Sequence, residues 1–165
     1  MGIKSDILDN IVSTLETISI ATGYSLDIQS AKRIALPTEK LNAQDRISSC
    51  LVSFARETKF KDNQFADDLM FNAIALFAIR ASMDNVSQNI FLDFMEDIEA
   101  VLSKDGSRGG LTGDSYIVKE TWISEIDMVV TEEFNQEAIQ EAILMCNVSY
   151  SYIPLKLSGT SDRLG

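Results

Sequence analysis

The chain has 165 residues, which is enough for one domain that buries roughly two-thirds of the surface exposed by its unfolded chain. A hydrophobic fraction of 45% argues against global disorder, and a net charge of −11 argues against a duplex-DNA-binding surface, which needs lysine and arginine to neutralise phosphates. The chain contains no histidine, so a nucleophile assisted by histidine is excluded.

The first expected element is an amphipathic helix from Ser5 to Ala21. Its apolar stripe consists of residues at spacings of four, four and three, namely Ile7, Ile11, Leu15 and Ile18. Ser5 is placed to cap the start of the helix, and Gly23 is placed to end it in the left-handed conformation.

The pattern weakens between Tyr24 and Ser49. Only the stretch from Arg33 to Leu36 suggests a short strand. The stretch from Pro37 to Arg46 is polar and has few apolar anchors, so we expect an exposed loop there. The alternative is an arm that contacts a partner protein.

The longest nearly uncharged run extends from Asp68 to Ser82. Its composition favours a helix, whereas its alternating apolar residues fit one face of a strand. A predicted strand from Ser49 to Lys59 precedes it, and the polar segment Lys61–Gln64 fits a turn between the two runs. We therefore predict an antiparallel hairpin. The run is also too short for a membrane-spanning helix, which needs about 20 apolar residues.

A second amphipathic helix is predicted from Val86 to Ser103, with Asp84 or Ser87 as its cap. Five acidic residues in and just after this helix could be taken for a metal site: Asp93, Glu96, Asp97, Glu99 and Asp105. The simpler interpretation, a solvated helix face, is favoured.

A glycine-rich segment, residues 105–114, follows the second helix. It lacks the Gly-Lys-Ser/Thr ending of a phosphate-binding loop, so we expect a flexible connection. The residues after it predict a long strand from Tyr116 to Val130 with one buried face, an acidic connection over Thr131–Glu137, and a last strand from Ala142 to Tyr152. These two strands should form a second antiparallel hairpin.

This order of elements predicts an α+β fold: a largely antiparallel or mixed sheet of four to five strands, with two helices packed on one face. Residues 1–153 should form a single domain, and residues 154–165 a flexible C-terminal tail.

The sequence contains no recognisable enzymatic, cofactor-binding or metal-binding constellation. Carboxylate pairs are uninformative in a chain with 25 acidic residues, and no nucleotide-binding fingerprint occurs. Two isolated cysteines, Cys50 and Cys146, cannot complete a structural zinc site. They lie in apolar stretches, and no secretory signal opens the chain, so we expect cytosolic synthesis with reduced thiols.

One family resemblance rests on the order and hydrophobic spacing of these elements. The opening helix Lys4–Leu15, an irregular arm, a hairpin, the helix Phe91–Leu102, the strand segment Trp122–Asp127 and a closing alternating strand follow one another. This arrangement resembles the tail terminator and related tail-completion proteins of long-tailed, siphovirus-type bacteriophages. The similarity covers about residues 4–153.

The resemblance implies a structural virion protein rather than an enzyme. Such a protein is assembled in the host cytoplasm, forms a hexameric ring at the head-proximal end of the tail, stops growth of the tail tube and offers a surface for joining the head. Its partners would be the tail tube protein and a head-completion or neck protein, with no cofactor, metal or membrane. The alternative is a small cytosolic regulatory domain that binds a protein or ligand on its open sheet face.

A ring also suggests roles for residues in the predicted turns. Carboxylates lining the lumen would repel DNA and let it pass without sequence-specific binding. The candidates for the lumen or rim are Asp62, Glu132 and Glu133. The candidate subunit contacts are three aromatic residues near hairpin ends, for which local packing is the commoner role: Phe60, Phe65 and Phe134.

Overall fold

The computed structural model describes residues 2–34, 48–60, 71–84, 86–113, 116–129 and 140–153. Its elements are, in chain order, α1 (Ile3–Leu15), the 3-10 helix η1 (Ile20–Thr22), β1 (Ser30–Arg33), β2 (Ser49–Phe60), β3 (Phe71–Met83), α2 (Gln88–Ser103), β4 (Tyr116–Val129) and β5 (Gln140–Tyr152). The strands form a five-stranded sheet of order β1-β2-β3-β5-β4.

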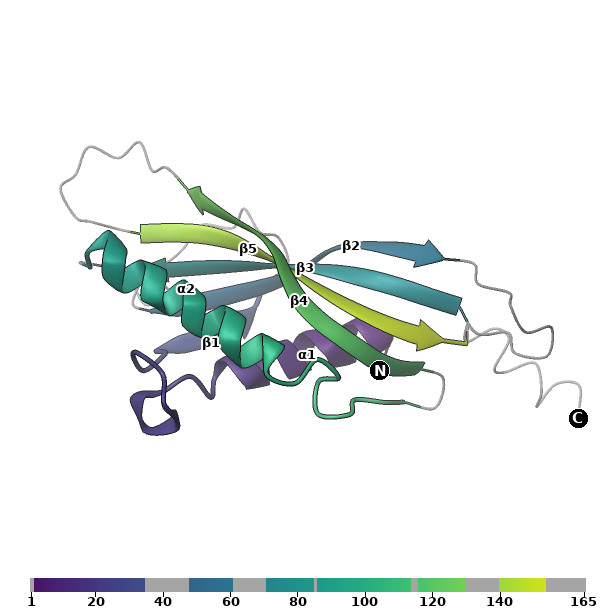
Figure 1. Cartoon of the computed structure of the whole chain (residues 1–165). Coiled ribbons are helices and arrows are strands. Elements are labelled where there is room, and N and C mark those ends of the chain that lie inside the picture. The colour runs from purple at the N-terminus through teal and green to yellow at the C-terminus, as the bar shows by residue number, and fades with distance from the viewer. Residues whose placement is uncertain are drawn as a thin grey trace, which may run out of the picture.

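The sheet is mixed but mostly antiparallel. β1 pairs with β2 in parallel, and the other three pairings are antiparallel. Both helices lie on the same side of the strongly twisted sheet, with α1 against β1 and β2 and α2 against β3 and β4 (Figure 1). The predicted fold class is therefore confirmed. The predicted tail, residues 154–165, lies outside the described residues.

β3 is the central strand, which confirms the strand prediction for the nearly uncharged run that ends at Ser82. It pairs with β2 on one side and with β5 on the other along nearly its whole length. Its core-facing side chains are all buried: Ala73, Ala75, Phe77, Ile79, Ala81 and Met83. The predicted parity is confirmed. The hydrogen bonds to two neighbouring strands outweigh the weak helix preference of alanine, because propensity is easily overridden by tertiary context.

α1 is shorter than the predicted helix from Ser5 to Ala21, because the chain leaves the helix at Leu15 and turns into η1. Ser19 caps η1: its hydroxyl accepts from the backbone N–H of Thr22 at 3.2 Å, and the Thr22 hydroxyl accepts from the N–H of Ser19 at 3.2 Å. Gly23 takes the expected left-handed conformation, φ +97°, but it ends η1 rather than α1. Serine and threonine side chains often compete with a helix in this way, because their hydroxyls bond to nearby backbone groups.

Of the two serines predicted to cap a helix, only one does so. Ser87 caps α2, and its hydroxyl accepts from the N–H of Ile90 at 3.4 Å. Ser5, the predicted cap of α1, lies inside the helix, whose N-cap is Gly2. The Ser5 hydroxyl instead accepts from the guanidinium of Arg33 at 3.2 Å. It therefore joins α1 to the edge strand β1.

The acidic side of α2 is only partly a solvated face. Asp93, Glu96 and Glu99 are exposed as predicted. Asp97, however, is 8% exposed, and its carboxylate accepts from the backbone N–H of Ser25 at 2.9 Å and from the Ser25 hydroxyl at 3.1 Å. The prediction was wrong for Asp97, whose carboxylate fixes the turn after η1 against α2.

The prediction of one buried face along β4 was also wrong. β4 contains two bulges, in which Lys119 and Ser124 are the extra residues, and each bulge reverses the alternation of the side chains. Trp122 consequently lies on the sheet face that is turned away from the helices. Only three β4 residues are buried: Tyr116, Val118 and Thr121.

The start of α1 is tied to the sheet through a buried carboxylate. Glu57 of β2 accepts hydrogen bonds from Lys4 at 2.8 Å and from the hydroxyl of Tyr150 in β5. Burial alone would raise the pKa of the Glu57 carboxyl, but these hydrogen bonds and the nearby charges of Lys4 and Lys59 lower it below its usual value. The net effect is a carboxylate that stabilises the folded chain in its ionised form.

We predict that the loss of stability in Glu57→Gln depends on pH. A group with a lowered folded-state pKa contributes fully above its unfolded pKa of about 4.3, and the contribution disappears as pH falls through the folded-state pKa. Urea unfolding at neutral pH should therefore show a clear deficit that shrinks in strong acid. Lys4→Gln, which removes the cationic partner, should follow the same trend. An equal deficit at both pH values would contradict this role.

We expect Phe77→Ala to destabilise the fold by about 3–5 kcal/mol, because it opens a cavity in the core. Phe77 has no exposed surface. The matched control is Phe60→Ala, at a position that is 47% exposed at the end of β2, where the cost in a dilute solution should stay below about 1 kcal/mol. Urea unfolding measures both, and equal costs would contradict the assignment of the two sheet faces.

Candidate functional site

The sheet face turned away from the helices is the main candidate for binding another protein. We call it the outer face. Both helices lie on the other side (Figure 1), and no described helix or strand packs against it. By register, its apolar residues are Leu51, Phe60, Ile74, Leu76, Ala78, Ile117, Trp122, Val129, Ile143 and Met145. Two of them, Leu51 and Ala78, are buried. An apolar surface of this kind on a folded chain is typical of an interaction site.

Three of these side chains are substantially exposed. Trp122 is 36% exposed, whereas Phe60 and Ile117 are each 47% exposed. Ile74 and Leu76 in β3 are partly buried between their neighbours. The outer face therefore exposes large apolar side chains on β2, through Phe60, and on β4, through Ile117 and Trp122. Tryptophan is the residue most often enriched among dominant contacts in protein interfaces.

The outer face is hollowed where bulges in two strands lie opposite each other. Ala55 is the extra residue in β2 and Ser124 in β4. Between them lies a hollow of about 350 Å³, whose lining includes Leu76 and Met145. Asn147 also lines it and donates to the Ser124 hydroxyl at 2.7 Å. Bulges bend a strand and re-aim its side chains, so this hollow is built by the backbone.

Charge is distributed unevenly across the outer face. On the β2 side it carries the exposed cation Arg56, whereas on the β4 side it carries Glu120, Glu125 and Asp127. None of these four makes an ion pair in the described ranges. A partner that covered this surface would meet positive charge at one side and negative charge at the other.

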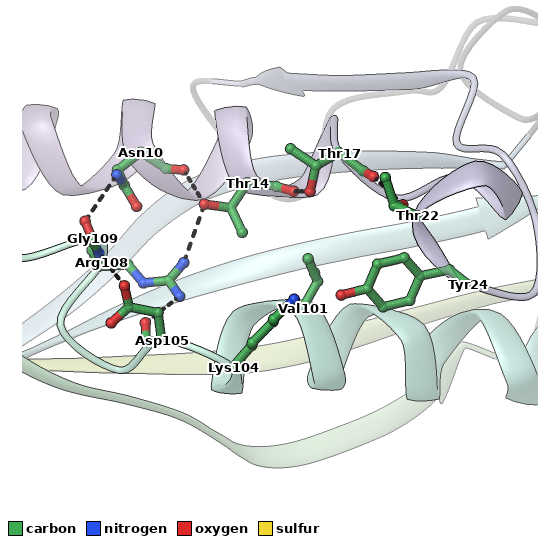
Figure 2. Close-up of a pocket in the computed structure, with 10 residues that line it drawn as sticks. All are labelled: Asn10, Thr14, Thr17, Thr22, Tyr24, Val101, Lys104, Asp105, Arg108 and Gly109. Carbon is green, nitrogen blue, oxygen red and sulfur yellow. Dashed lines mark hydrogen bonds between the residues drawn. The ribbon is translucent and has the colours of Figure 1, made fainter.

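A second hollow of about 610 Å³ lies between α1, α2 and the loop after α2 (Figure 2). Arg108 lines one end of this hollow (Figure 2) and is only 4% exposed. Its guanidinium donates to the carbonyl oxygens of Leu102 and Asp105, the latter at 2.7 Å, and to the hydroxyl of Thr14 at 3.4 Å. Arg108 thus caps the C-terminal end of α2 and joins it to α1.

The loop that carries Arg108 is held by one carboxylate. Asp105 accepts from the backbone N–H and hydroxyl of Ser107, at 3.1 and 2.7 Å, and from the N–H of Gly109 at 2.8 Å. The hydrogen bond from the Ser107 hydroxyl is the main reason why the pKa of Asp105 is lowered. Asp105 and both terminal nitrogens of the Arg108 guanidinium make internal bonds, so we interpret this hollow as a structural joint. Two buried atoms that line it, Nε of Arg108 and Oδ1 of Asn10, have no hydrogen-bond partner in the described part of the chain.

The sequence did not reveal this joint, because the segment was interpreted as a flexible connection. One signal was available: an arginine followed directly by Gly109 and Gly110. Arg108 has φ +57°, and both glycines have φ +72°. Three successive residues with positive φ make a tight reversal, in which glycine carries no steric cost. That reversal turns the arginine back under α2.

Of the residues predicted to form subunit contacts or a lumen, the structure places only Phe60. It lies at the end of β2 on the outer face. The other candidates lie outside the described residues, so their roles stay predictions: Asp62, Phe65, Glu132, Glu133 and Phe134.

The described residues offer no chemistry for catalysis that stands out. Within them, no group of three or more cysteine, aspartate and glutamate side chains could hold a metal ion. Cys50 and Cys146 are free and buried, and burial raises the pKa of both thiols, that of Cys146 to about 12. No helix in the described part of the chain is long and apolar enough to cross a membrane.

Comparison with known proteins identifies a shared fold. No protein-family model matches the sequence, and no curated protein matches it. Among solved structures, a chain of the "Virion of native gene transfer agent (GTA) particle" superposes with a TM-score of 0.54 at 12% identity, over 86% of this chain and 91% of that chain. The likeness thus spans nearly the whole of both chains, and at this identity it concerns the fold.

We predict that Arg108→Met lowers the free energy of unfolding by about 2–4 kcal/mol, because it leaves buried carbonyl oxygens without a donor. Lys104→Met is the matched control, since Lys104 lines the same hollow but is exposed, and it should cost less than about 0.5 kcal/mol. Urea unfolding compares the two. A small effect of Arg108→Met would contradict the structural role.

Proposed function

We propose that this chain is a structural subunit of a phage-like particle, and specifically a tail terminator. Support comes from the shared fold, since a chain of a gene transfer agent virion matches over 86% of this chain. The resemblance to tail terminators, which rests on the order of the elements, points in the same direction. The large apolar side chains that the outer face exposes, Phe60, Ile117 and Trp122, are what a subunit of a larger assembly needs.

In this proposal the subunits form a hexameric ring at the head-proximal end of the tail. One ring face binds the last layer of the tail tube protein and blocks further growth. The other face receives a head-completion or neck protein. Assembly takes place in the host cytoplasm, and the ring then remains part of the virion. The role is structural and non-enzymatic, and it uses no cofactor.

The acidity of the chain gives the ring a physical property. With a net charge of −11 per subunit, a ring repels the phosphates of DNA rather than binding them. We propose Asp62, Glu132 and Glu133 as the residues of the lumen or rim. DNA would then pass through without sticking and without sequence-specific contacts.

We expect the purified chain to assemble into a ring and to stop the growth of tail tubes. Light scattering and negative-stain images test the ring. Adding the chain to tube protein polymerising in vitro tests termination: tubes should stop lengthening and carry a density at one end, whereas tubes without the chain continue to grow. A chain that stays monomeric at high concentration and leaves tube growth unchanged would overturn the proposal.

A further inference from the structure

The outer face has an accessible half, which extends from the hollow between the bulges to the end of β2. We call it the docking surface. The register sets four of its residues side by side, one on each of four strands: Arg56, Leu76, Asn147 and Trp122. Phe60 and Ile117 lie at the two ends of another such row. A partner that covers these large apolar side chains on β2 and β4 also covers β3 and β5 between them.

The charges of the outer face are separated. On β4, three exposed carboxylates that make no ion pair within the described residues lie on this face: Glu120, Glu125 and Asp127. The exposed cation Arg56 lies across the sheet on β2, whereas Lys32 lies in β1 beside the buried Leu51. Arg80 is compensated by Glu141 at 3.2 Å. The surface around Trp122 is therefore acidic, even with Lys119 in the neighbouring bulge.

We propose that the docking surface binds a protein other than this chain, through a segment that presents apolar side chains together with lysine or arginine. The proposal rests on the proposed function, in which other particle proteins are the partners, and names the surface and the chemistry of the contact. Glu120 and Glu125 lie on either side of Trp122 on the same face. A cation placed there meets both carboxylates and the indole ring, which is the best aromatic partner for a cation.

The hollow gives an apolar side chain of the partner a place next to that cation. Ala55, Leu76 and Met145 contribute apolar surface to its lining. On its polar side, the Asn147 amide already donates to the Ser124 hydroxyl at 2.7 Å. An apolar group that fills the hollow therefore excludes water from the contact, as the side chains around a dominant interface residue do.

The hollow also fixes the direction of the partner segment. Arg56 and Glu125 both line it, and they come from β2 and β4. A lysine or arginine is attracted to the β4 side and repelled from the β2 side, where Arg56 favours a carboxylate or carbonyl oxygen. Complementary charges of this kind set the orientation of a contact more than its total affinity.

A second copy of this chain fits the docking surface less well. Its helix α2 exposes three carboxylates that the β4 side repels: Asp93, Glu96 and Glu99. Two outer faces related by a two-fold axis would set one Arg56 against three carboxylates at each side, and the remaining carboxylates would be covered without a cation. Each copy also carries a net charge of −11. The proposal therefore leaves the contact between ring subunits to another surface of the chain.

The test uses the fluorescence of Trp122, which is the only tryptophan in the chain. The probes are two synthetic peptides with the same leucine spacing of an amphipathic helix, one with lysine and one with glutamate at the polar positions. In about 0.15 M salt, which screens distant charges, the lysine peptide should change the Trp122 emission saturably. The glutamate peptide should bind at least about 10-fold more weakly.

Two matched charge reversals locate the contact. One variant combines Glu120→Lys, Glu125→Lys and Asp127→Lys on the outer face. The other makes the same change of net charge on α2, on the opposite side of the sheet (Figure 1), with Asp93→Lys, Glu96→Lys and Glu99→Lys. The first should weaken binding of the lysine peptide by about 10-fold or more, and the second by less than about twofold.

Circular dichroism checks that both variants fold, and the single change Glu125→Gln provides a milder test that should weaken binding about threefold. Equal losses in the two triple variants, or a lysine peptide that binds without changing the Trp122 emission, would overturn the proposal. A Trp122 emission that changes with the concentration of the chain alone would place a second copy on this surface and would overturn it too.

The tail-tube assay separates this contact from the proposed function. A chain whose Trp122 responds to the lysine peptide as expected, but which never stops tube growth, would refute the terminator role and leave the contact standing. A chain that forms rings and stops tube growth, but binds the lysine peptide no better than the glutamate peptide, would refute the contact and leave the terminator role standing.

Discussion

The two faces of β3 impose the main constraint on this molecule. One face presents small and large apolar side chains in alternation, and α1 and α2 are the elements that cover it. Alanines at 73, 75 and 81 leave room for large core residues such as Phe91 and Phe94. Both helices lie on that side, and no described helix covers the opposite face. The rest of the structure keeps the two helices in place.

Two groups of polar contacts hold the helices on the sheet, one at each end of α1. Near the start, Lys4 and Tyr150 share the carboxylate of Glu57. Near the end, Arg108 links the last turn of α2 to Thr14. Buried polar groups that are hydrogen-bonded specify one arrangement more strictly than apolar contacts do. In the Arg108 joint, only Nε of the guanidinium has no partner among the described residues. The helices are thereby held in a fixed position on the sheet.

How far the sequence predicts this fold depends on the periodicity of each segment. β3 and β5 alternate without interruption, and both were predicted as strands, although β5 begins two residues before the predicted Ala142. β4 has the same apparent alternation, but bulges at Lys119 and Ser124 change which side chains share a face, and a pattern of residue types does not reveal a bulge. The shortened α1 has a similar origin, since the Ser19 cap competes locally with the helix.

The candidate site was less predictable than the fold. Phe60 was identified from its position at a hairpin end, but Trp122 was not identified because its face depends on the bulges. Arg108 and Asp97 were missed because both are charged residues whose burial depends on partners distant in sequence, such as Thr14 and Ser25. Charge patterns indicate exposure on average, and they fail where one tertiary hydrogen bond replaces water.

In the proposed virion role, the two core thiols matter when the assembled particle leaves the cell in which it is made. Cys50 and Cys146 are buried, and their raised pKa values keep them protonated and therefore poor nucleophiles. Transfer from a reducing cytoplasm to an oxidising medium changes exposed thiols first. In the proposed virion role, the subunit would keep the same covalent structure on both sides of host lysis without needing a disulfide for its stability.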